Sequence, residues 1–96
     1  MIQIAVIETN KAERLMKALC NHFARKITAH YEGDKGYIDF GIGKCEITAT
    51  ASTMTFRVEA ENGNNLSRVE GVVVEHLLRF TPGEDIQFVW KDPFTI

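Results

Sequence analysis

The hydrophobic period of this chain changes twice along its 96 residues, and this change constrains the fold more than any other feature. Apolar side chains recur every three or four residues over 12–23, every second residue over 26–60, and every three or four again over 66–80. Steps of three and four are typical of a helix with one buried face, and steps of two of a strand with one buried face. The sequence therefore predicts two amphipathic helices that flank a run of strands.

The first predicted helix follows a short strand at 2–7, IQIAVI, which is rich in branched residues. Asn10, with Glu13 three residues later, matches the capping-box pattern and marks the expected beginning of this helix. Its buried stripe consists of Ala12, Leu15, Met16, Leu19 and Phe23.

The second predicted helix begins after the polar stretch ENGNN, with Asn64 or Asn65 as its expected cap, and ends before TPG at 81–83. Its main stripe consists of Leu66, Val69, Val73, Leu77 and Phe80. Val74 and Leu78 fall outside that stripe, on another flank. They indicate either a homodimer contact along this helix, which we favour, or a wider contact with the core.

Between the helices the chain has the pattern of four short strands, separated by a turn at EGDKG, by glycines at 41 and 43, and by a link around Ser52. The residues expected to face the core are Ile38, Phe40, Ile42, Cys45, Ile47, Ala49, Met54, Phe56 and Val58. Polar and charged residues alternate with them, so one face of an antiparallel sheet is apolar and the other is wet. A last strand, DIQFVW, is expected over 85–90.

The elements thus follow the order β-α-β-β-β-β-α-β. We expect a single α+β domain over residues 1–96, because a chain of this length cannot supply two cores. The simplest packing is a two-layer sandwich, in which an antiparallel sheet carries two helices on one face.

Composition excludes several classes of function. A formal net charge of −2 and scattered basic residues disfavour a nucleic-acid partner or an anionic membrane surface. No apolar run is long enough to span a membrane, and the first residues lack the features of a secretory signal. Two cysteines are too few for a disulfide framework, so we expect a reduced, cytoplasmic chain.

Cys20, His22 and His76 are the side chains with the most chemical potential. A helical wheel places each histidine on the flank of its stripe, near the C-terminal end of its helix. Neither parallel nor antiparallel helices would bring the two rings together, so we expect them at separate borders of the core. Only a large crossing angle or a second copy of the chain would bring them into one site. The spacings match no metal motif, and we expect neither a metal nor a cofactor. Cys20 is expected to act as a small buried hydrophobe.

Lys26 and Arg79 each follow a histidine near a helix end. Cations at this position complement the helix dipole, and the binding of an anion is a second role that suits them.

Four segments, LMKALCNHFARKI, GKCEI, VVVEHLLRF and QFVW, resemble the bacterial domain-of-unknown-function family 2218 over nearly the whole chain. Its family positions are Cys20, His22, Phe23, Lys26, His76, Leu77, Arg79, Phe80 and Trp90. Many members carry a second histidine where this chain has Arg25. The resemblance implies a small bacterial cytoplasmic domain linked to iron or siderophore utilisation.

These observations favour a non-enzymatic accessory or binding module for an unidentified protein or small molecule, and no residue is assigned a catalytic role. The alternative is a small enzyme, or a metal or redox protein, that uses Cys20, His22 and His76. The candidate functional cluster consists of Cys20, His22, Lys26, His76, Arg79 and Trp90.

Overall fold

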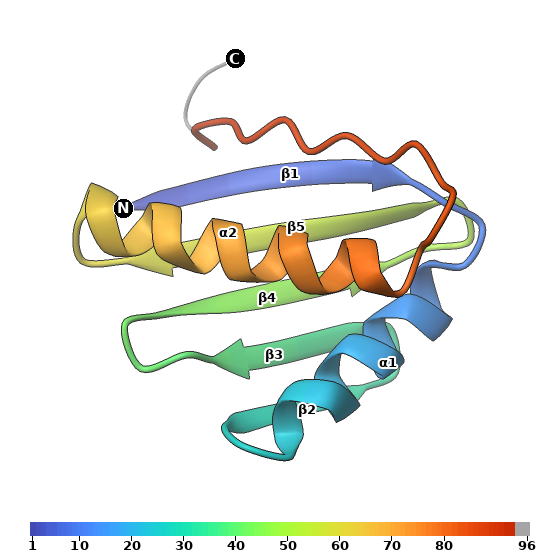
Figure 1. Ribbon diagram of the computed structural model, residues 1–96, viewed down its shortest axis with the longest axis horizontal. Helices are drawn as coiled ribbons and strands as arrows, with labels where there is room; N and C mark the ends of the chain where they lie inside the picture. The colour runs from blue at the N-terminus through green and yellow to red at the C-terminus, as the bar shows by residue number, and fades with distance from the viewer. Residues whose placement is uncertain (94–96) are drawn as a thin grey trace.

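The structure, a computed structural model, describes residues 1–93 and shows a five-stranded sheet with two helices on one face (Figure 1). The elements are β1 (Ile2–Glu8), α1 (Ala12–Ala24), β2 (Thr28–Glu32), β3 (Lys35–Asp39), β4 (Gly43–Ala49), β5 (Thr53–Ala60) and α2 (Gly63–Arg79). The strand order is β1-β5-β4-β3-β2, and every neighbouring pair is antiparallel. The predicted α+β sandwich is therefore confirmed.

The register of the strands decides which side chains face the helices. Cys45 in β4 stands opposite Ile38 in β3 and Val58 in β5, and all three are fully buried. The next residue along, Glu46, stands opposite Arg57 on the other face, where their side chains approach to 3.6 Å. The sheet thus has an apolar face under the helices and a polar face away from them.

The two helices divide the apolar face between them. α1 lies over β2 and β3, and α2 lies over β4 and β5 (Figure 1). Their axes are neither parallel nor antiparallel, so the helices touch only over a short stretch. Within residues 1–93, neither helix is long and apolar enough to cross a membrane.

The predicted stripes form most of the core. All five stripe residues of α1 are buried, and four of the five in α2 are. Phe80 is 38% exposed because it lies just past the last turn of α2, as its C-cap. Ile42 is 36% exposed, against prediction, because it stands in the turn between β3 and β4.

Both predicted helix caps are wrong. Lys11 rather than Asn10 is the N-cap of α1, and no side chain caps that end. The side chain of Asn62 caps α2 by accepting a hydrogen bond of 2.8 Å from the backbone N–H of Asn65. A cap depends on the backbone angles of the preceding loop, which a side-chain pattern locates only to within a few residues.

The strand predicted over 85–90 is not part of the sheet. The chain there runs beside β1 (Figure 1), and Ile4 and Lys91 exchange two backbone hydrogen bonds, of 2.8 and 2.9 Å. Phe88 and Trp90 still pack against the core. Side-chain packing therefore holds this segment against the domain, and a regular ladder with β1 does not form.

Candidate functional site

Two histidine rings meet where α1 and α2 approach each other. The ring centroids of His22 and His76 lie 5.1 Å apart, with 47° between the ring planes. The prediction that these rings lie at separate borders is therefore wrong. It assumed parallel or antiparallel helices, whereas α1 and α2 cross obliquely over the sheet (Figure 1), and an oblique crossing brings flanks together near the point of contact.

Phenylalanine rings surround this histidine pair. Phe23 lies 4.7 Å from His76 and 5.3 Å from His22, measured between ring centroids. Phe80 approaches His22 edge-on at 5.9 Å, and Phe40 packs under Phe23 at 5.1 Å. Phe23 is buried, whereas Phe80 is 38% exposed. The histidine pair therefore packs on apolar side chains and has one side accessible to solvent.

A backbone hydrogen bond orients His76. Its Nδ1 lies 2.8 Å from the carbonyl oxygen of Val72, one turn earlier in α2. A carbonyl oxygen only accepts, so Nδ1 carries the proton and donates it. The Nε2 atom of His76 is left free to accept a hydrogen bond when the ring is neutral, or to donate one when it is protonated.

Basic side chains gather around the pair. Arg25 and Lys26 follow the end of α1, and Arg79 is the last residue of α2. His22 is exposed, yet desolvation where its ring packs on its neighbours lowers its pKa, and so do the ring of His76 and the three cations. We call these five residues the histidine–cation cluster. Lys26 and Arg79 belong to the predicted set, and Arg25 was missed because nothing in its local pattern distinguishes it from a solvated helix-end cation.

The histidine–cation cluster carries an excess of positive charge. Arg79 pairs with Glu75 at 2.7 Å, whereas Arg25 and Lys26 form no ion pair within residues 1–93. The C-terminal end of each helix contributes roughly half a negative charge. With neutral histidines, three cations against Glu75 and two helix ends leave an excess of about one positive charge.

Cys20 lies apart from the cluster. It is fully buried, and its Sγ lies 2.9 Å from the point where a Cβ on Gly36 of β3 would be. Burial raises the pKa of Cys20, an effect that a hydrogen bond from the backbone of Tyr37 partly opposes. Burial also raises the pKa of Cys45, and the nearby Cys20 adds to this. Both thiols lie in the core between the sheet and the helices and are protonated at neutral pH.

Trp90 also lies elsewhere. Its ring stacks on Phe88 at a centroid distance of 5.7 Å, and Phe88 packs on Phe56 of β5 at 5.3 Å. The following residue, Lys91, pairs with β1. The fold thus brings His22, His76, Lys26 and Arg79 to one end of the helices, buries Cys20 in the core and packs the half-buried Trp90 against that core.

The cluster is not suited to a resident metal ion. No three His, Cys, Asp or Glu side chains in the described part of the chain lie close enough together to hold one. Two imidazoles leave half of a four-coordinate site unfilled, and the surrounding cations repel a metal ion. Imidazole, guanidinium and ammonium N–H groups are instead the donors that bind anionic oxygens.

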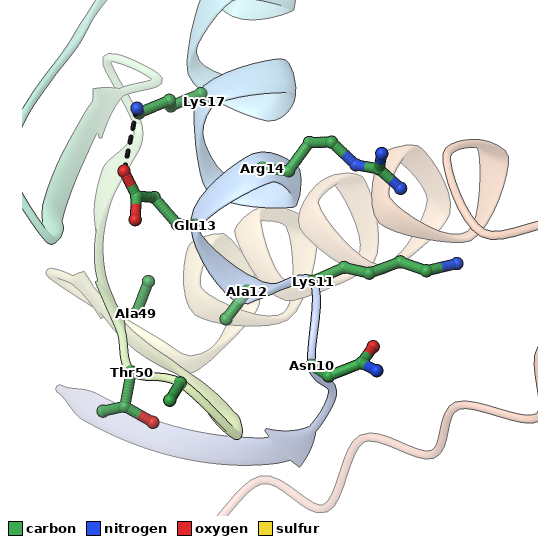
Figure 2. A pocket seen from close by; sticks show the side chains of 9 residues that line it. Asn10, Lys11, Ala12, Glu13, Arg14, Lys17, Ala49 and Thr50 are labelled. Carbon is green, nitrogen blue, oxygen red and sulfur yellow. Dashed lines mark ion pairs between the residues drawn. The ribbon is translucent and has the colours of Figure 1, made fainter.

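A pocket of about 860 Å³ lies at the N-terminal end of α1, away from the histidine–cation cluster (Figure 2). Lys17 pairs there with Glu13 at 2.8 Å, and Lys11 lies 3.8 Å from Glu84. Carboxylates thus accompany two of its cations, and no histidine or aromatic ring lines it. We therefore place the candidate site at the histidine–cation cluster.

A five-stranded antiparallel sheet, two helices on one face and a basic cluster at their crossing define a small two-layer α+β domain. The chain belongs to domain-of-unknown-function family 2218, described as an uncharacterised protein conserved in bacteria, whose profile matches residues 4–91. The family resemblance is thus confirmed. The NMR structure of PA4090 from Pseudomonas aeruginosa is similar, with a TM-score of 0.79 and 26% identity over 95% of this chain and 96% of that chain. None of the curated proteins matches the chain.

Proposed function

We propose that this protein is a non-enzymatic binding module that takes a small anion at the histidine–cation cluster. One observation carries the proposal: the rings of His22 and His76 touch at 5.1 Å, inside a group of cations that carboxylates do not balance. Two imidazoles, two guanidinium groups and an ammonium group supply N–H donors, and an anionic oxygen is the acceptor that such donors bind best.

The surroundings of the cluster favour an organic anion over a bare inorganic ion. Phe80 is 38% exposed at the edge of the cluster and offers an apolar ring beside the cations. A carboxylate attached to a hydrocarbon or aromatic group would bind the cations through its oxygens and pack its apolar part on the ring of Phe80. The link with iron or siderophore utilisation stays a prediction, and ferric citrate is the probe that addresses it, because it combines iron with carboxylates.

The position of Cys20 supports binding rather than catalysis. The alternative enzyme or redox protein needs the thiol beside the two histidines, whereas its Sγ lies against β3 with a raised pKa. A protonated, buried thiol is a poor nucleophile. Cys20 and Cys45 are both free, which supports the reduced cytoplasm as the compartment that we propose.

A titration with citrate, phosphate and ferric citrate tests the proposal. Amide NMR signals of the cluster are expected to shift in the wild-type protein, and Arg79→Gln or Lys26→Gln is expected to weaken binding about fivefold, as the loss of about 1 kcal/mol from one exposed ion pair would. Lys11→Gln, at the opposite end of α1, is the matched control and is expected to leave binding unchanged. Equal effects in the three variants, or shifts away from the cluster, would overturn the proposal.

We also propose that a second copy of the chain docks against α2. The outward face of this helix exposes 42% of Leu78, beside the half-buried Val74. A Cβ on Gly71, in the same outward region, would meet no atom within 4 Å, so another helix has room to approach. The strip of Gly71, Val74 and Leu78, with Arg68 and Glu75 at its sides, leaves space for close approach and supports a symmetric helix–helix contact.

A further inference from the structure

His22 stands among positive charges from both elements that approach it. His76 lies against it from α2, Arg79 follows His76 by three residues, and Arg25 and Lys26 follow His22 by three and four residues at the end of α1. Each of these groups lowers the pKa of His22, and no described carboxylate raises it. Without an anion, these groups therefore favour the neutral ring of His22 at neutral pH.

A bound anion reverses this balance. Negative charge placed among the cations offsets their repulsion of a proton on His22, and an imidazolium ring attracts the anion in return. The two effects are reciprocal, because a ligand that favours the protonated ring must itself bind that ring more tightly. Protonation also adds substantially to the excess of about one positive charge that the neutral cluster carries.

We propose that anion binding at the histidine–cation cluster is coupled to partial proton uptake by His22, an inference that rests on the function proposed above. The affinity for an anion then changes little with pH in alkaline solution. It rises as the pH falls through the pKa of His22 in the complex, and becomes constant below the pKa of His22 in the empty protein. A tenfold gain in affinity corresponds to about one unit between these two pKa values.

Inorganic sulfate is the probe, because its charge does not change between about pH 5 and 8 and all titration then belongs to the protein. The full chain is titrated by NMR over this range, with sulfate or with chloride at equal ionic strength. The pKa of His22 is expected to rise by about half to one unit in sulfate. His30, whose ring packs on Tyr37 on the polar face of the sheet, is the internal control, and its ring signals are expected to be the same in sulfate and in chloride.

Calorimetry in two buffers of different ionisation enthalpy measures the protons taken up with sulfate. We expect a fraction of one proton at pH 6.5 and close to none at pH 8, with an affinity about three- to tenfold higher at pH 5.5 than at pH 7.5. His22→Asn is expected to remove most of this pH dependence, and His30→Asn to retain it.

The outcomes separate the two proposals. Sulfate binding without a change in the pKa of His22 overturns the proton coupling and leaves the anion site standing. Proton uptake that persists in His22→Asn and is lost in His76→Asn overturns the assignment to His22. No perturbation of the cluster by sulfate at either pH 5.5 or pH 7.5 overturns the anion site and the coupling together.

Discussion

The Sγ atom of Cys20 lies 2.9 Å from the position that a Cβ atom on Gly36 would occupy. Met16, one turn earlier in α1, has its Cγ 3.0 Å from the same position. Gly36 is buried on the apolar face of β3, and its missing side chain is what lets α1 lie directly against the sheet. This contact helps to set the place of α1 on the sheet, and with it the place of His22.

Gly36→Ala is expected to destabilise the protein by about 1–3 kcal/mol, because an added methyl group in a packed core displaces its neighbours. Urea or thermal unfolding measures the loss. Gly71→Ala is the matched control, since a Cβ there meets no atom within 4 Å. It is expected to stabilise the protein by up to about 1 kcal/mol, because alanine favours the helical backbone more than glycine does.

The same contact is tested by a double-mutant cycle with Cys20→Ala, which removes the Sγ atom. Gly36→Ala is expected to be less destabilising in the Cys20→Ala protein than in the wild type. If the loss were the same in both backgrounds, the Cys20 thiol would not be the atom that Gly36 accommodates.

Both cysteines are expected to react slowly with a thiol reagent in the native protein. Cys20 and Cys45 are buried, and burial raises the pKa of each thiol, so few reactive thiolates reach the reagent. Labelling followed by mass spectrometry measures the rate, and unfolding in urea is expected to make both thiols reactive at once. Rapid labelling of Cys20 in the native state would revive the redox alternative.

Glu70→Gln is expected to stabilise the protein at neutral pH. The Oε2 atom of Glu70 is buried and has no hydrogen-bond partner in the described chain, and burial raises the pKa of this carboxyl group above its ordinary 4.5. A raised pKa in the folded state means that the carboxylate destabilises the fold above that pKa and no longer does so below the unfolded value.

We therefore expect a rise in melting temperature of up to about 4 °C at pH 7, equivalent to under about 1 kcal/mol, that disappears near pH 4. Glu75→Gln is the control, because Glu75 is exposed and pairs with Arg79. It is expected to give no stabilisation. An equal gain from Glu70→Gln at pH 4 and at pH 7 would count against an ionised, buried carboxylate as the cause.

Leu78→Glu is expected to convert a dimer into a monomer without unfolding it, because the side chain is 42% exposed in one chain and a carboxylate there opposes its copy across the contact. Sedimentation equilibrium measures the change. Val6→Glu is the control, since Val6 is 56% exposed on β1, away from α2. A wild-type chain that stays monomeric at about millimolar concentration would overturn the dimer proposal. A dissociation constant above about 1 mM corresponds to a binding free energy of less than about 4 kcal/mol.

Periodicity was enough to predict the layers of this fold. Steps of two along 26–60 and steps of three and four along both helices predict which side of each element is apolar. A sheet with one apolar face and two helices with one apolar face each have one compact packing. Residues such as Met16, Phe56 and Leu77 were for this reason predicted to be buried, and all three are. The segment at 85–90 shows the limit, because alternation predicts which side chains pack but not whether the backbone joins a ladder.

The contact between His22 and His76 depends on the angle between the two helix axes, which the hydrophobic periodicity does not specify. A helical wheel reports the direction of a side chain about its own axis, and the direction of that axis over the sheet depends on contacts between residues far apart in the sequence. The close approach of α1 to β3 at Gly36 is one such contact. The local pattern therefore established which faces are apolar, and the oblique crossing of two helices established that two imidazoles and three cations share one place.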